Sequence, residues 1–118
     1  MMAKNPQKII EKIRECIMQY PEVEESSACT RISFKVRKKG VVFVSEKNYD
    51  IMVKLDKSQQ QVAKLQQKHP QNYHIGKHGW VTIVFEGESA PSFTTMKKWI
   101  DESYRILAPK KLVATLEN

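Results

Sequence analysis

The stretch RISFKVRKKGVVFV, residues 31–44, decides the fold of this chain. Apolar and polar residues alternate from Arg31 to Arg37, which is the period of two expected of a strand with one buried face. Lys38-Lys39-Gly40 predicts a turn, and the run from Val41 to Val44 predicts a strand that returns beside the first. The stretch therefore predicts an antiparallel hairpin with one basic face.

Further strands are predicted on the C-terminal side of this hairpin. Ile51, Val53 and Leu55 would share one face of a third strand. A second hairpin is predicted over residues 73–85, with two glycines in its turn and strongly strand-forming residues from Trp80 onward. The first hairpin and the third strand would form an antiparallel meander.

Helices are predicted on both sides of the strands. Asn5-Pro6 combines a helix-capping residue with proline at the first helical position, and Ser58 with Gln61 has the spacing of a capping box. We predict helices at residues 6–20, 58–69, 92–107 and 112–116, and an irregular acidic connection at residues 22–27. The chain of 118 residues is expected to form one α+β domain over residues 1–118, an antiparallel sheet of about five to six strands with helices packed on one face.

The composition excludes several classes of protein. A hydrophobic fraction of 41% and a charged fraction of 28% are those of a globular chain. No apolar run approaches the roughly 20 residues of a membrane helix, so we expect no membrane association. The two cysteines, Cys16 and Cys29, are too few for a disulfide framework, which favours a reduced, cytoplasmic protein. We favour a monomer.

The net charge of +7 is concentrated in the middle of the chain. Residues 31–80 carry eleven basic and three acidic side chains, whereas residues 1–30 have a net charge of −1 and residues 81–118 have none. A basic patch of this kind attracts polyanions by releasing their counterions. The alternative is a charge that only keeps the protein soluble.

No residue pattern predicts catalysis, a metal or a cofactor. His74 and His78 flank a predicted turn and have no third ligand at a matching spacing. The run Gly76-Lys77-His78-Gly79 lacks the pattern of a phosphate-binding loop and precedes a strand. Neither cysteine has a neighbouring base that would activate it. We expect a protein that is not an enzyme and binds neither a metal nor a cofactor.

The basic residues are predicted to share one face of the sheet. If Ile32, Phe34 and Val36 face the helices, the alternation places Arg31, Lys35, Arg37 and Lys54 on the opposite face. Trp80 would lie on that face as well, where it could stack on bases. Burial of Trp80 by the C-terminal segment is the alternative.

The order of motifs resembles the MmcQ/YjbR family over nearly the whole chain. The resemblance rests on Phe34-Lys35-Val36 with Lys39 and Val42-Phe43-Val44, on Asp50 to Leu55, on Tyr73-His74-Ile75 with Lys77 and Trp80-Val81-Thr82, and on Ser103-Tyr104. It implies a CyaY-like fold with a saddle-shaped sheet and a double-wing motif that binds DNA. Iron binding, which the likeness to frataxin-type folds raises, is not expected, because the charges of the first helix nearly cancel.

The leading hypothesis is a DNA-binding module without enzymatic activity that contacts the phosphate backbone. The candidate residues are Arg31, Lys35, Arg37, Lys38, Lys39 and Lys54, with His74, Lys77 and Trp80 on the second hairpin. Sequence-specific readout is not expected, because no recognition helix is evident. The alternative is a domain that binds a protein or a small ligand on the same face without nucleic acid.

Overall fold

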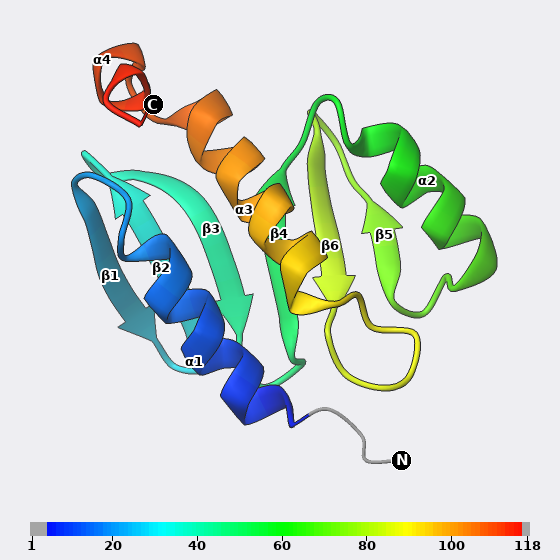
Figure 1. Ribbon diagram of the computed structural model, residues 1–118. Coiled ribbons are helices and arrows are strands. Elements are labelled where there is room, and N and C mark those ends of the chain that lie inside the picture. The colour runs from blue at the N-terminus through cyan, green and yellow to red at the C-terminus, as the bar shows by residue number, and fades with distance from the viewer. Residues whose placement is uncertain (1–4, 117–118) are drawn as a thin grey trace.

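Six strands form one antiparallel sheet in the computed structural model, which describes residues 5–116. The strands lie side by side in the order β1-β2-β3-β4-β6-β5 (Figure 1). They span β1 Val23–Ala28, β2 Arg31–Val36, β3 Lys39–Ser45, β4 Asp50–Lys54, β5 Tyr73–Ile75 and β6 Trp80–Val84. The predicted α+β fold with an antiparallel sheet is confirmed.

The helices are arranged unequally around the sheet. They span α1 Pro6–Ile17, α2 Gln59–Lys68, α3 Phe93–Leu107 and α4 Lys110–Ala114. Helices α1 and α3 lie over one face, α2 lies along β5, and between residues 5 and 116 no helix covers the opposite face (Figure 1). None of the described helices is long and apolar enough to cross a membrane.

The core lies between the sheet and helices α1 and α3. Ile32, Phe34 and Val36 are at most 2% exposed, as the alternation in β2 predicts. The predicted N-cap of α1 is confirmed, because the side chain of Asn5 accepts from the N–H of Gln7. At α3 the side chain of Ser92 caps the helix by accepting from the N–H of Thr95. Capping therefore determines where each of these helices starts, and the apolar residues along one side of the helix determine which side faces the sheet.

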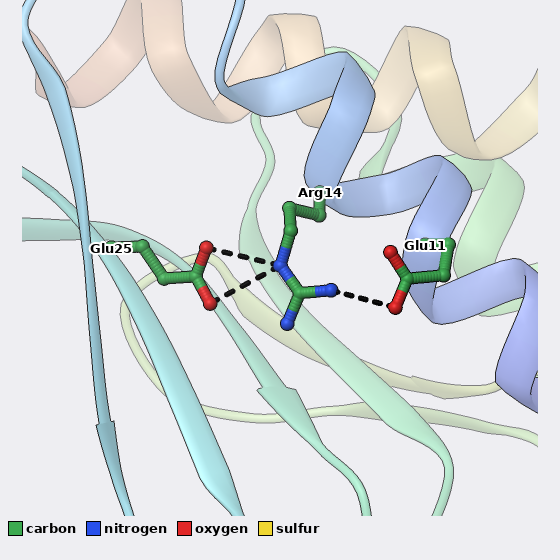
Figure 2. A network of polar contacts seen from close by, with 3 residues as sticks. All are labelled: Glu11, Arg14 and Glu25. Atoms are coloured by element: carbon green, nitrogen blue, oxygen red, sulfur yellow. Dashed lines mark hydrogen bonds and ion pairs between the residues drawn. The ribbon is translucent and has the colours of Figure 1, made fainter.

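An ion-pair network attaches α1 to the edge of the sheet. The Nε atom of Arg14 lies 3.0 and 3.2 Å from the two carboxylate oxygens of Glu25, and its Nη1 lies 2.8 Å from Glu11 (Figure 2). Glu25 belongs to β1, so the guanidinium joins the first helix to the first strand. The two carboxylates raise the pKa of Arg14.

Two predictions about local structure are wrong. Residues 22–27 were predicted to be irregular, but Val23–Ala28 form the edge strand β1, paired along its length with β2. The turn of the first hairpin was predicted at Lys38-Lys39-Gly40, whereas Lys39 already pairs with Val36. The turn is made by Arg37 and Lys38 alone, both with positive φ.

The predicted capping box at the start of α2 is also wrong. The side chain of Ser58 makes no capping hydrogen bond to its own helix and instead donates to Glu102 on α3 at 2.6 Å. The carboxylate of Glu102 also accepts from the N–H groups of Asp56, at 2.6 Å, and Ser58, at 3.2 Å. A side chain distant in sequence thus satisfies the free N–H groups before this helix.

Candidate nucleic-acid interface

The face of the sheet opposite α1 and α3 is called the open face here. Its side chains alternate with core residues along each strand. They belong to Glu24, Ser26, Ala28, Arg31, Ser33, Lys35, Phe43, Ser45, Asp50, Met52, Lys54, His74, Trp80, Thr82 and Val84. The prediction that Arg31, Lys35, Lys54 and Trp80 share one face is confirmed.

A bulge in the first hairpin brings an unexpected aromatic ring to the open face. Phe34 pairs with Val42 but Lys35 pairs with Gly40, so Val41 is the extra residue and the alternation of β3 shifts there. Val41 and Val42 are both buried, and Phe43 therefore points the same way as Gly40. Sequence reasoning missed Phe43 because the run Val41–Val44 is apolar throughout and shows no alternation.

Gly40 makes room for that ring. A Cβ atom at this position would lie only 2.3 Å from Cζ of Phe43, so the ring lies against the backbone of its own strand. Any side chain at position 40 would displace the ring. Gly40 and Phe43 thus form one unit on the open face.

Trp80 lies beside Phe43 and not under the C-terminal segment. The two ring centroids are 5.7 Å apart and the ring planes are tilted by 55°. Trp80 is half-buried and pairs with Lys54 across β4 and β6. The alternative in which the C-terminal segment buries Trp80 is therefore wrong. The two rings form a partly exposed apolar area near the end of the sheet at which β6 begins.

Lysine side chains flank the two rings. Lys35 stands opposite Gly40 on β2, and Lys54 stands opposite Trp80 on β4. Neither lysine makes a salt bridge within residues 5–116. Glu24 is the cross-strand neighbour of Lys35 on β1, which reduces the positive potential at that edge.

A buried carboxylate lies at the other end of the open face. Asp50 is 9% exposed, and its Oδ1 is the buried side-chain atom that lacks a hydrogen-bond partner in the described part of the chain. Burial raises the pKa of Asp50, while the charges of Arg31 and His74 oppose that rise. Arg31 is therefore partly balanced by a carboxylate that its spacing in the sequence did not reveal.

The two hairpin tips emerge at the same end of the sheet. Because β4 is antiparallel to both β3 and β6, its last residue, Lys54, lies at the end where those two strands begin (Figure 1). The first tip consists of Arg37 and Lys38, followed by Lys39, and the second tip spans residues 76–79. Lys54 thus lies between two basic tips.

The first tip has an unfavourable backbone conformation. Arg37 and Lys38 have φ values of 50° and 73°, in the left-handed region where two-residue hairpin turns favour Asn and Gly. For residues with a Cβ this conformation costs roughly 1–2 kcal/mol each. Strained residues of this kind gather at functional sites. The tip therefore keeps two cations at a cost in stability.

Arg37 does not share the open face, contrary to the prediction. The alternation of β2 ends at Val36, and the left-handed turn carries Arg37 out of the strand. Its Nε lies 2.9 Å from Glu22, and each partner favours the charged form of the other, so the pKa of Arg37 is raised and that of Glu22 is lowered. Of the nine candidate residues, Arg37 is the one that forms a salt bridge with a carboxylate within residues 5–116.

The second tip carries Lys77 and His78, both exposed. Gly79 has a φ of 87°, and a Cβ there would lie 2.9 Å from the carbonyl oxygen of Leu55, so the turn requires glycine. His74 precedes the tip on β5, where it is exposed opposite Thr82. The tip is thereby fixed to the end of β4 next to Lys54.

The helix side of the molecule has shallow grooves instead of an open face. One of them, about 360 Å³ in volume, is lined by Tyr20, Thr94, Lys97, Lys98 and Asp101. Asp101 is engaged there, because it accepts from Tyr20 at 2.7 Å and pairs with Arg105. Within residues 5–116 no three His, Cys, Asp or Glu side chains gather in a way that could hold a metal ion.

Comparisons with known proteins agree with this architecture. The model of the YjbR family matches residues 18–106. A search of curated proteins found no match. Among solved structures, protein DR2400 of Deinococcus radiodurans, described as having a DUF419 domain, superposes with a TM-score of 0.69 at 20% identity, covering 91% of this chain and 83% of that one. This structural likeness supports the fold alone.

Proposed function

We propose that this chain, which belongs to the YjbR family, is a DNA-binding module that holds the phosphate backbone against the open face and the two hairpin tips. The observation that carries the proposal is the position of Lys54 between the tips. Lys39 and Lys77 lie at the strand ends on either side of it, so three cations from separate segments occur at one end of the sheet, the side chain of Lys39 on the face of Val36. Phosphates attract cations gathered in this way.

The strain of the first tip supports the same proposal. A turn of Asn and Gly would form the hairpin at lower energy than Arg37-Lys38 does. An anion outside the chain that meets these two cations would explain why the tip keeps them despite the cost of their left-handed conformations. Glu22 balances only Arg37, and Lys38 makes no salt bridge within the described residues.

The proposed contacts position the DNA without reading its sequence. Lysine side chains that contact phosphates carry no information about the bases. Sequence readout in the major groove requires a helix or a two-stranded ribbon with side chains that reach the base edges. The helices described here lie on the other side of the sheet or along its edge. We therefore expect similar affinity for duplexes of different sequence.

Fluorescence anisotropy with a labelled duplex tests the proposal. If about five phosphates are neutralised, log K falls with log salt with a slope of about −4 to −5. The titration is made with the full chain at about 50 and about 200 mM salt, a range over which these slopes correspond to a loss of roughly 250- to 1000-fold in affinity. Absence of binding to this duplex and to a labelled single strand of the same length at the lower salt would contradict the proposal.

A second function, docking of a protein partner, is favoured by the apolar part of the open face. Phe43, Met52, Trp80 and Val84 are half-buried there, and no helix covers them in the part of the chain that is described. Protein interfaces are enriched in aromatic residues and methionine and depleted of lysine. The lysines around the rings favour the nucleic acid, and failure of both duplex and single strand to bind would favour the protein.

A further inference from the structure

We propose that the ring pair of Phe43 and Trp80 stacks on unpaired bases, so that the preferred ligand is single-stranded nucleic acid. This inference rests on the proposed function and narrows its ligand class. Duplex DNA offers phosphates to the lysines but keeps its base faces stacked within the helix. Only a single strand presents both phosphates and free base faces to the same surface.

The order of the strands places the two rings together on the open face. Phe43 and Trp80 lie on β3 and β6, on either side of β4, with centroids 5.7 Å apart. The bulge at Val41 turns Phe43 outward, and the absence of a side chain at Gly40 lets the ring lie against the backbone. Both rings are half-buried, so their positions are fixed by packing while part of each stays accessible.

Each of the two rings has a lysine beside it. Lys35 stands opposite Gly40, against which the ring of Phe43 lies, and Lys54 stands opposite Trp80. Proteins that bind single strands combine such cations, which follow the backbone, with aromatic rings on which successive bases stack. One ring–lysine pair lies across β2 and β3, and the other lies across β4 and β6. The two pairs would accommodate two consecutive nucleotides.

The apolar part of the open face is left uncovered by the described residues. Two aromatic rings and Met52 occupy the middle of a sheet face over which the described residues place no helix. Lys35 and Lys54 beside the rings disfavour an uncharged or basic occupant, and the hairpin tips add positive charge at the end of the sheet where Trp80 lies. An occupant with flat apolar rings joined by anions matches both features.

Tryptophan fluorescence gives a direct measurement of stacking. The chain has two tryptophans, and Trp99 is 1% exposed in the core while Trp80 is half-buried on the open face. Titration with an unlabelled oligothymidylate of about 12 nucleotides is therefore expected to quench Trp80. The Trp80→Phe variant, which keeps a ring beside Phe43, is expected to lose the quenching while it still binds.

Oligonucleotides without bases isolate the contribution of stacking in the wild-type protein. An abasic strand of the same length and charge should bind more weakly than oligothymidylate, by about 5- to 100-fold for each base that stacks on a ring. Equal affinity for the two strands would overturn the inference. Phe43→Leu should reduce the affinity for oligothymidylate and leave the affinity for the abasic strand unchanged.

The failure of this inference and the failure of the proposed function give different results. Binding to a hairpin duplex with no quenching by the single strand overturns the inference and leaves DNA binding in place. No binding to duplex, oligothymidylate or abasic strand at low salt overturns both. Preference for oligothymidylate over the duplex, together with quenching that requires Trp80, supports both.

Discussion

The hydroxyl of Ser103 accepts a hydrogen bond from the main-chain N–H of Lys54 at 2.9 Å. The same hydroxyl donates to the carbonyl oxygen of Val41 at 2.6 Å. The ladder between β3 and β4 ends at the pair Val42–Val53, and Ser103 connects the two strands just beyond it. A fully buried residue of α3 therefore holds the backbone of the cation that lies between the two hairpin tips.

Replacing Ser103 with Ala is expected to destabilise the fold by about 1–3 kcal/mol, because two buried main-chain groups lose their partner. Urea unfolding followed by circular dichroism measures the change. The matched control is Ser27→Ala at an exposed position of β1, for which we expect a change in the free energy of unfolding within about 0.5 kcal/mol. Equal changes in the two variants would contradict the role given to Ser103.

Replacing Lys38 with Gly is expected to change stability and affinity in opposite directions. Glycine adopts the φ of 73° without steric cost, so the free energy of unfolding should rise by up to about 1 kcal/mol. The loss of one cation should weaken DNA binding. Lys39→Gln, in the regular strand next to it, is expected to weaken binding with no gain in stability. A Lys38→Gly variant that binds as tightly as wild type would place this tip outside the interface.

Glu102 is expected to make the attachment of α2 dependent on pH. Burial raises the pKa of its carboxyl group, but hydrogen bonds from Ser58 and from the N–H groups of residues 56–58 outweigh burial and lower the pKa below its ordinary value of 4.5. Because the folded pKa is lower than the unfolded one, the stabilisation is present above pH 4.5 and is lost as the pH falls through the folded pKa. Glu102→Gln should therefore be less stable than wild type near neutral pH, and the difference should shrink in acid. Thermal unfolding over this pH range measures it, and a difference that is constant with pH would rule out the ionised carboxylate as the cause.

Asp50 is expected to have the opposite effect. Burial raises its pKa above the ordinary value of 3.8, so the ionised carboxylate destabilises the fold above the folded pKa, and this cost disappears as the pH falls. Asp50→Asn should raise the melting temperature at neutral pH, with a gap to wild type that closes in acid. It should also tighten DNA binding, because Arg31 no longer faces a negative charge. A lower melting temperature at neutral pH would show that the carboxylate stabilises the fold in its charged form.

The sequence predicted the parts of the fold that depend on local patterns. The alternation around Phe34 fixed the faces of β2, and Ser92 marked the start of α3, because each effect acts over a few residues. Strand β1 was missed because Val23–Ala28 contains few strand-forming residues and owes its conformation to pairing with β2. The turn was misplaced because Arg37 and Lys38 are not residues that favour positive φ.

Only part of the candidate interface could be predicted in the same way. Lys35, Lys54 and Trp80 were placed on one face by the period of two. The outward turn of Phe43 depends on a bulge, and the burial of Asp50 depends on how three strands pack, so neither follows from residue spacing. The hydrogen bonds of Ser103 and Glu102 join residues more than 40 positions apart, which a local pattern cannot show.

The most direct test of the central claim compares the salt dependence of two charge-matched triple variants. The first, Lys39→Gln, Lys54→Gln and Lys77→Gln, removes the cation next to the first tip, one cation of the second tip and the one between them. The second, Lys98→Gln, Lys110→Gln and Lys111→Gln, removes three exposed cations from α3 and α4. For duplex DNA we expect the slope of log K against log salt to become less negative by about 3 in the first variant and to stay at the wild-type value in the second. Equal slopes in the two variants would contradict an interface at the hairpin tips.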